Sequence, residues 1–348
     1  MAKPSLPIVS ERAEILRALR GGEWVSLATI ADACAMRASD TENALRALRA
    51  DGVAIEENHR NEFCLREPVS PMDSIRLKNA LHQSGYLPAG RFELLDSVDS
   101  TSSWLDRKAQ SGLSIHRLAC LSEFQSAGRG RRGRHWQGAP YENIMLSLGW
   151  EFSGSANTLA GLSLSLGVVI ADGIQSLTGA PIRLKWPNDL WCRNRKLGGI
   201  LVEAFSSGSA TTRAIMGIGI NICPAEVNPL DAGYSVTDLI SECVGPVPAR
   251  EEIAAAVLGG ISERLERFLS DGFAADLKRF NELDIFLNQE ICLSSAQGER
   301  IAVGLGADES GAYRLNTGDG AQIVNAGELS LSLRDNSLSH TETRSQEL

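Results

Sequence analysis

The spacing of apolar residues near the N-terminus predicts three short helices followed by two strands. The expected elements are a helix over residues 11–20, helices that begin after Ser26 and after Ser39, and strands over residues 53–55 and 62–65. Ser39 and Glu42 have the spacing of a capping box, and Gly52 is a residue type that ends helices. Three helices and a hairpin form the pattern of a winged helix-turn-helix unit, which we expect over residues 1–67.

The middle of the chain mixes helical and strand patterns, which predicts an α/β region over residues 72–282. Residues 159–177 are apolar at helical spacing, as in a buried helix, and residues 214–222 have the pattern of a buried strand. Residues 253–268 show the single apolar face of an amphipathic helix.

The C-terminal part carries short β segments over residues 286–334, separated by Gly, Asp and Asn. This pattern predicts a small β-barrel. The polar tail from Asp335 is expected to be disordered, and residues 68–71, bounded by prolines, are a predicted linker.

Composition narrows the class of protein. The 348 residues suffice for two or three domains, and 43% of them are hydrophobic, enough for a sizeable core. The apolar runs are shorter than the ~20 residues of a membrane helix, and the N-terminus lacks a signal-peptide core. The seven cysteines form no CxxC pair, which argues against structural zinc and for reduced thiols. We therefore expect a cytoplasmic protein with no membrane partner.

The charge pattern leaves the role of the N-terminal unit open. A net charge of −9 argues against general nucleic-acid binding, and residues 1–66 carry nine basic and ten acidic side chains. DNA-reading helices present basic and amide side chains, yet the third predicted helix opens with Asp40, Thr41, Glu42 and Asn43. DNA binding and a purely packing role both remain open.

Residues 123–134, EFQSAGRGRRGR, place Arg129, Arg131, Arg132 and Arg134 among three glycines. Glycine allows close backbone approach to a ligand, and arginine offers a planar cationic fork for phosphate or carboxylate. We therefore predict a mobile lid over an anion. An RNA-binding arginine–glycine tail is the alternative, but apolar segments flank the stretch and favour a loop between two buried strands.

Two further motifs follow, KWPND at 185–189 and RKLGGILVE at 195–203. Asn188 offers an amide for an adenine edge, and Asp189 a carboxylate that could hold a metal or accept a proton. Lys196 is a compact charge suited to phosphate or a reacting carboxyl group. Gly198 and Gly199 permit close approach of a flat ligand. A lone Lys or Asp is more often part of a polar turn or a solvated surface, but the whole set beside strands is much less common by chance and favours a site.

These motifs, in this order and spacing, resemble those of bacterial biotin–protein ligases of the bifunctional biotin operon repressor type. The matching segments are DSTS (99–102), QSAGRGRRGR (125–134), HW (135–136), KWPNDL (185–190), RKLGGILVE (195–203) and GIGIN (217–221). The likeness is specific over about residues 94–222 and weaker toward both ends.

The resemblance implies a class II synthetase-like catalytic domain of the α/β type, preceded by the winged helix-turn-helix and followed by an SH3-like β-barrel. It implies an enzyme that joins biotin and MgATP into biotinyl-5′-adenylate and pyrophosphate. A lysine of a biotin carboxyl carrier protein then attacks the mixed anhydride and releases AMP. A biotin-responsive repressor that binds operator DNA, and a homodimer, are also implied.

The resemblance also assigns residues. The implied biotin contacts are Ser100, Thr101, Ser102, Gln125, Gly128, Arg129, Arg131, Lys196, Gly199 and Gly217. The implied nucleotide contacts are Arg131, Arg132, Trp136, Asn188, Asn221 and Tyr234. Arg129, Arg131 and Lys196 would offset the repulsion between carboxylate and triphosphate, and Asp189 would help to deprotonate the incoming lysine. Trp136 has the alternative role of a buried core residue.

Three positions depart from the family pattern. Tyr234 stands where the family has an adenine-stacking tryptophan, Arg334 lies two residues beyond the expected nucleotide-binding arginine, and the third helix carries acids in place of basic residues. Two other functions stay open. A lipoate–protein ligase would share the fold and the adenylate chemistry, and a mainly DNA-binding, biotin-sensing regulator would use the N-terminal unit.

Overall fold

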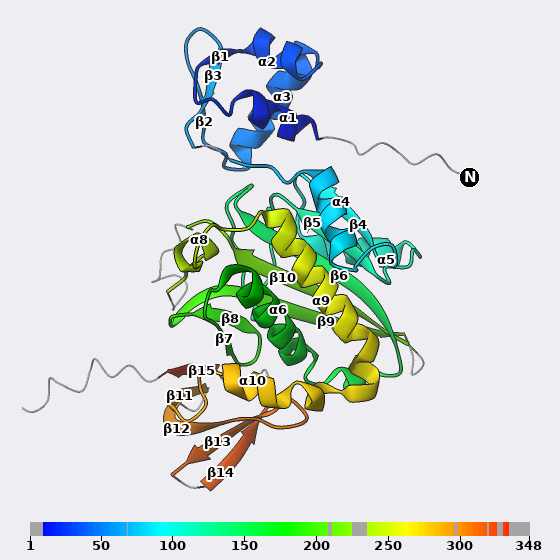
Figure 1. Cartoon of the computed structure of the whole chain (residues 1–348), viewed down its shortest axis with the longest axis vertical. Coiled ribbons are helices and arrows are strands. Elements are labelled where there is room, and N and C mark those ends of the chain that lie inside the picture. Colours follow the sequence, from blue (N-terminus) through cyan, green and yellow to red (C-terminus); the bar gives the residue numbers. More distant parts are fainter. Residues whose placement is uncertain are drawn as a thin grey trace, which may run out of the picture.

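The computed structural model describes residues 10–67, 69–207, 211–224, 235–295, 298–318, 320–325 and 330–333. Its strands form three sheets of three, seven and five strands, which follow one another along the chain (Figure 1). The seven-stranded sheet is mixed and has helices on both of its faces, so the central region has an α/β fold.

The first sheet packs with three helices, as the apolar spacing predicts. The elements are α1 (Glu11–Ala18), β1 (Val25–Ser26), α2 (Leu27–Ala33), α3 (Ala38–Ala50), β2 (Ile55–Glu57) and β3 (Glu62–Leu65). Ile15, Leu16 and Leu19 of the first predicted helix are fully buried in a core cluster of this unit. Tyr141, from the central region, belongs to the same cluster and so joins the two regions.

Local details of this unit differ from the prediction. Ser26 does cap α2, because its Oγ accepts from the backbone N–H of Thr29 at 3.2 Å. The capping box at Ser39 is wrong, since α3 already begins at Ala38 and Arg37 occupies the cap position without a side-chain cap. Arg37 instead pairs with Asp40, with 2.7 Å between Nε and Oδ2. The strand predicted over residues 53–55 lies two residues later, at Ile55–Glu57.

The central sheet has the strand order β4-β5-β6-β10-β9-β8-β7. Its strands are β4 (Arg91–Leu95), β5 (Leu118–Ser122), β6 (Asn143–Ser153), β7 (Ile182–Lys185), β8 (Asp189–Cys192), β9 (Arg195–Ser207) and β10 (Thr211–Asn221). The helices are α4 (Ser74–Gln83), α5 (Thr101–Gln110), α6 (Leu162–Thr178), α8 (Leu239–Glu242), α9 (Arg250–Asp271) and α10 (Leu277–Leu283). Only the first pair, β4 and β5, runs parallel; the other neighbours are antiparallel.

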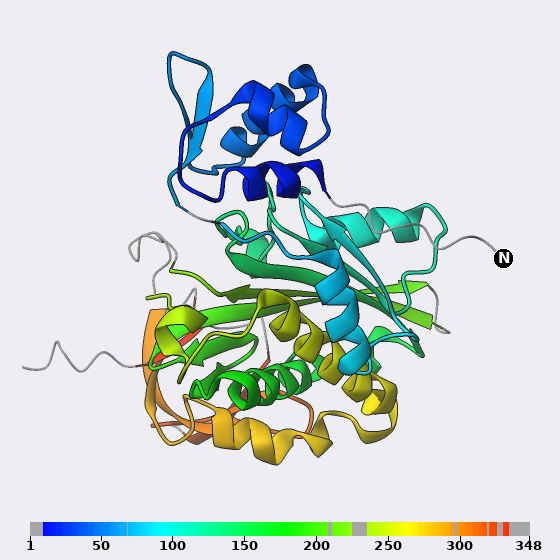
Figure 2. The ribbon, with the colours of Figure 1, turned by 45° about the horizontal axis from the view of Figure 1, so that its top comes forward.

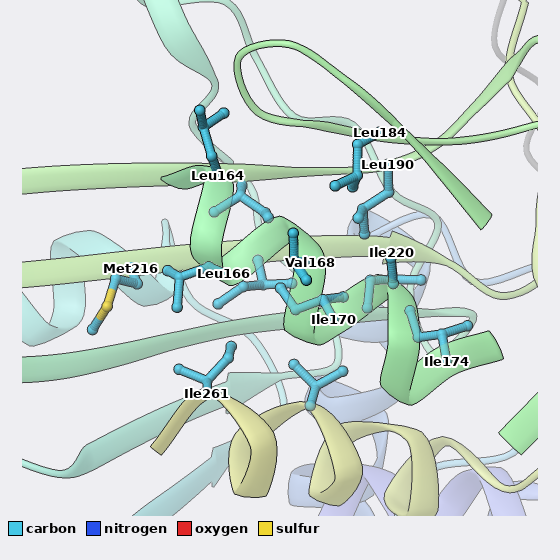
Figure 3. Close-up of a cluster of buried hydrophobic side chains, with 14 of the residues drawn as sticks. Leu164, Leu166, Val168, Ile170, Ile174, Leu184, Leu190, Met216, Ile220 and Ile261 are labelled. Carbon is cyan, nitrogen blue, oxygen red and sulfur yellow. The ribbon is translucent and has the colours of Figure 1, made fainter. Parts of the chain in front are cut away.

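The two faces of the sheet can be followed along β5. Ala119 and Leu121 belong to the large core cluster that includes α4, α6 and α9, whereas Leu118 and Cys120 pack with α5. Because successive side chains of a strand point to opposite faces, α5 covers the face opposite to the other three helices. Figure 3 shows side chains of α6, β10 and α9 meeting in the large cluster, and Figure 2 shows the helices along the sheet.

The main elements predicted here are confirmed, with small shifts of their ends. The buried helix expected at 159–177 is α6, the strand expected at 214–222 is β10, and α9 contains the helix expected at 253–268. One segment of the described chain, Ala156–Thr178, is long and apolar enough to cross a membrane by length and composition. It contains α6, whose apolar side chains lie in the core cluster.

The third sheet is antiparallel, with the order β14-β13-β12-β11-β15. Its strands are β11 (Glu290–Ser295), β12 (Gly298–Ala307), β13 (Tyr313–Thr317), β14 (Gly320–Val324) and β15 (Ser330–Leu333). It is fastened to the central sheet through the KWPND segment, because the indole N–H of Trp186 donates to the carbonyl of Gly311 at 3.1 Å. Arg183 adds hydrogen bonds to the backbone carbonyls of Leu283 and Asp284.

Candidate functional site

A cavity of ≈ 390 Å³ opens beside β8, β9 and β10 and is roofed by the arginine–glycine loop. Its lining comes from the start of α5, the arginine–glycine loop, β6, the β7–β8 turn, β9 and β10. The residues are Ser100, Ser102, Gln125, Arg129–Arg132, Arg134–Trp136, Leu146, Lys185–Asp189, Lys196, Gly199–Leu201 and Gly217–Gly219. The motifs singled out in the sequence therefore meet at one place.

The arginine–glycine stretch is a loop between the buried strands β5 and β6, as predicted. A backbone hydrogen bond joins the two ends of the loop: the N–H of Trp136 donates to the carbonyl of Gly128 at 2.9 Å. A side chain at Gly128 would bring its Cβ to 2.5 Å from the carbonyl oxygen of Trp136, so glycine is required for this approach. Arg129 extends from the loop to Glu203 on β9, with 2.6 Å between Nη2 and Oε2.

One end of the cavity is lined by hydroxyl and amide groups. Ser102 and Thr101 both hydrogen bond to Ser147 of β6, at 2.8 and 2.7 Å between their hydroxyl oxygens. Thr101 does not line the cavity itself, but its backbone N–H and hydroxyl donate to Oε1 of Gln125 at 2.8 and 3.0 Å. Gly217 faces this group, and a Cβ there would lie 2.9 Å from the Ser102 hydroxyl.

The other end is strongly cationic. Among the described residues that line the cavity, six are cations and one, Asp189, is an acid; the cations are Arg129, Arg131, Arg132, Arg134, Lys185 and Lys196. Lys196 pairs with Asp189, with 2.9 Å between Nζ and Oδ1. Arg131 donates to Oδ1 of Asn188 at 3.1 Å, which joins the loop to the KWPND turn. Burial lowers the pKa of Arg131, and Arg132 beside it adds to the effect.

The structure brings together most, but not all, of the predicted site residues. Thr101 and Gly128 lie just behind the lining. Asn221 also lies outside it, and its Nδ2 donates to the carbonyl of Thr237 at 3.1 Å. Tyr234 and Arg334 lie outside the described residues. Lys196 lies in a strand, as the second residue of β9.

Several cavity residues were missed. Lys185 has its ammonium 4.5 Å from the centre of the Trp191 ring, and burial lowers the pKa of its amine. Ser147 lies behind the lining and orients Thr101 and Ser102; its hydroxyl stands among the apolar residues 144–150 of β6. Arg134, which was predicted as part of the lid, and His135 also line the cavity, although no ligand contact was assigned to them.

The architecture of the site agrees with comparisons to known proteins. A family model described as the Biotin/lipoate A/B protein ligase family matches residues 94–221. The chain is 31% identical to the Bifunctional ligase/repressor BirA of Escherichia coli (strain K12), over 91% of this chain and 96% of that protein. The chain belongs to the biotin protein ligase family. It is also 30% identical to the Biotin--[acetyl-CoA-carboxylase] ligase of Mycobacterium tuberculosis, over 74% of this chain and 95% of that protein.

A solved biotin protein ligase supports the fold. The enzyme from Aquifex aeolicus in complex with biotin and ATP aligns with a TM-score of 0.60 and 28% identity, over 70% of this chain and 99% of that chain. The match to the bifunctional relative extends further. Residues 68–348 are 281 of the 348 residues, so an alignment that covers 91% of this ligase must extend into the N-terminal unit.

Proposed function

We propose that this chain activates biotin with ATP and transfers it to a lysine of a biotin carboxyl carrier protein. In the first step the biotin carboxylate attacks the α-phosphorus of ATP, and pyrophosphate leaves with its bonding electrons. In the second step the lysine amine attacks the carbonyl of biotinyl-5′-adenylate, loses a proton and displaces AMP. The observation that carries the proposal is one cavity lined both by hydrogen-bonded neutral groups around Ser102 and Gln125 and by six cations.

The neutral end suits the ureido group and rings of biotin. Ser102 and Gln125 can hydrogen bond to the ureido group, with Ser100 beside them, while Thr101 and Gly128 hold the shape of the pocket. Gly199 and Gly217 leave room for the rings because no side chain projects from them. A small, mostly apolar ligand with a few convergent polar contacts is typical of such a pocket.

The cationic end suits the reacting carboxylate and the triphosphate. Arg129, Arg131 and Lys196 would offset the repulsion between the two anions, and Arg132 would bind phosphate from the loop. Lys185 adds a fifth cation, to which the sequence motifs alone assigned no role. Magnesium is generic for ligases that use ATP.

The lining offers candidate groups for magnesium and for adenine. Among the described residues, no group of three or more His, Cys, Asp and Glu is arranged to hold a metal ion. Asp189 supplies one carboxylate, and Mg²⁺ commonly binds through one or two carboxylates together with substrate phosphates. Asn188 and Trp136 line the cavity and remain our candidates for adenine, together with Asn221 and Tyr234.

Asp189 is also our candidate for the second step. A lysine amine is mostly protonated at neutral pH, so its attack needs a group that accepts the proton. Asp189 lies at the cavity wall and holds Lys196 by an ion pair, so one carboxylate would serve both half-reactions.

Isotope exchange tests the activation step. We expect the protein to exchange labelled pyrophosphate into ATP when biotin is present, because adenylate formation is reversible. Lipoate should give no exchange and no thermal stabilisation, whereas biotin should give both. Exchange that depends on lipoate in place of biotin would favour the lipoate–protein ligase alternative.

A second function, repression, is favoured by the bifunctional relatives. We propose residues 1–67 as a winged helix-turn-helix that binds operator DNA, residues 72–282 as the ligase domain, residues 286–334 as an SH3-like barrel, and a homodimer as the DNA-binding form. The arginines of α3 weigh against tight DNA binding, because Arg46 pairs with Glu42 and Arg49 with Glu57. A salt-dependent shift in the electrophoretic mobility of operator DNA upon adding biotin and ATP tests this role.

We also propose a cytoplasmic location, which fits seven cysteines that are all free.

A further inference from the structure

Glu242 is an acid with a fully buried side chain at the end of α8, and it does not line the cavity. Its Oε1 accepts hydrogen bonds from Nη2 of Arg195 at 2.6 Å and from the hydroxyl of Thr237 at 2.7 Å. Its Oε2 lies 3.4 Å from Nε of Arg193 and 3.3 Å from Sγ of Cys192. These bonds hold the pKa of the carboxyl below its usual range although burial opposes the charge.

The partners of Glu242 lie on both sides of Lys196. Arg193 and Arg195 are at the tip of the β8–β9 hairpin, and Thr237 follows a segment that pairs with Lys196 itself. The backbone N–H of Lys196 donates to the carbonyl of Ser235 at 2.9 Å, and its carbonyl accepts from the N–H of Thr237 at 2.8 Å. Glu242 thus ties the hairpin to the segment that holds the backbone of Lys196.

The strand alone does not fix this backbone. The pairing of β8 with β9 shifts its register between Leu190 and Trp191, so that Trp191 lies opposite Lys196 and Leu190 opposite Gly198. Such an irregular step redirects a side chain and leaves the local ladder incomplete. Lys196 therefore depends on contacts from outside the hairpin to aim its ammonium into the cavity.

We propose that Glu242 is a positioning residue that fixes the backbone of Lys196 and so places its ammonium against the reacting carboxylate and phosphate. The inference rests on the proposed function, since it assumes that Lys196 acts in biotin activation. A displacement of about 1 Å in a reacting group can reduce a rate by about a hundredfold. A buried carboxylate with four partners is suited to prevent such a displacement.

The test is a double-mutant cycle on biotin-dependent pyrophosphate release in the full chain. We expect Glu242→Gln, which keeps the volume but removes the charge, to lower kcat by about ten- to a hundredfold with a small change in the KM for biotin. In a Lys196→Ala background the same substitution should have almost no further effect. Glu242→Asp should recover part of the loss, and the exposed Glu263→Gln on α9, whose partner is Arg267, should match wild type.

Thr237→Val removes one hydrogen-bond donor to Glu242 with little change in shape. This variant provides a second test of the inference if Glu242→Gln does not fold. We expect it to lower kcat less, and again only when Lys196 is present. Equal losses in the presence and absence of Lys196, or no loss in either variant, would overturn the inference. Failure of the proposed function would look different, because wild-type protein would then release no pyrophosphate in response to biotin.

Discussion

Asp189 and Lys196 form an ion pair in the wall of the cavity, with 2.9 Å between Oδ1 and Nζ. They come from neighbouring strands and lie beside Gly199: a Cβ there would be at ordinary contact distance, 3.4 Å from the carboxylate and 3.6 Å from the ammonium. The pair keeps a cation and a proton acceptor side by side, although the two residues are not opposite each other in the sheet: Asp189 lies opposite Gly199 and Lys196 opposite Trp191. A ligand with a carboxylate and a phosphate would compete with Asp189 for Lys196.

We expect Lys196→Ala to slow the first half-reaction by about one to two decades, because a hydrogen bond to a charged group contributes ~1.5–3 kcal/mol. The loss also leaves Asp189 unpaired beside the anionic substrates. The rate of biotin-dependent pyrophosphate release measures the first half-reaction. Lys278→Ala, on the exposed side of α10, is the matched control. A normal rate in Lys196→Ala would remove this residue from the reaction.

Arg131→Gly should leave adenylate synthesis largely intact but let biotinyl-5′-adenylate escape. The substitution removes the hydrogen bond from Arg131 to Asn188 that holds the loop to the KWPND turn. Loss of this contact should raise the rate of dissociation more than it changes the chemistry. Free adenylate in the medium can be measured by chromatography, with the exposed Arg20→Gly as control. Adenylate at the wild-type level would contradict a role of the loop in retention.

Gly217→Ala should raise the KM for biotin by about one to two decades, since overpacking costs about 1–3 kcal/mol. The new methyl group would lie 2.9 Å from the hydroxyl of Ser102, so the polar end of the cavity must rearrange. Gly173→Ala on α6 is a matched control, because no atom lies within 4 Å of the added methyl. Steady-state kinetics with varied biotin give the KM for biotin of each variant. Equal KM values for Gly217→Ala and Gly173→Ala would exclude Gly217 from the biotin site.

The sequence predicted the parts of the fold in which one pattern dominates. The buried helix α6 and strand β10 are found where the apolar periodicity places them, and apolar runs on both sides identified the arginine loop correctly. The start of α3 was missed because Ser39 and Glu42 have a capping spacing, yet Arg37 and Asp40 pair with each other two residues earlier. Local signals of similar strength compete at helix ends, and the side-chain pair that forms decides between them.

The site was predicted through its charged motifs, and its supporting residues were not. Ser147 contacts Thr101, and Glu242 contacts Arg195, across segments far apart in the chain, and no local pattern encodes such contacts. Lys185 opens the KWPND motif, but no role was assigned to it from the sequence. Its burial against Trp191 becomes visible only once β7 and β8 pair.

The buried Asp284 should make stability depend on pH. Burial raises its pKa to about 6, although Tyr313 and the backbone N–H of Phe286 donate to the carboxylate. An unfolded Asp titrates near ~3.9, so the folded state holds the proton more tightly, and this stabilisation is full below about pH 4 and lost as the pH rises through about 6.

Asp284→Asn removes the titration. We expect the difference in free energy of unfolding, wild type minus variant, to fall by on the order of 2 kcal/mol between about pH 4.5 and pH 7.5. Urea denaturation at the two pH values measures this difference. A difference that is the same at both would show that Asp284 titrates as an ordinary exposed carboxyl group.

The most direct test of the account is the transfer reaction itself. The protein is incubated with biotin, ATP, magnesium and an isolated biotin carboxyl carrier domain, and the carrier is then analysed by mass spectrometry. We predict one biotinyl group on a single carrier lysine with the wild-type protein, and far slower modification with Lys196→Ala. A carrier that stays unmodified with active, folded wild-type protein would contradict the assignment of the cavity as the centre of a biotin ligase.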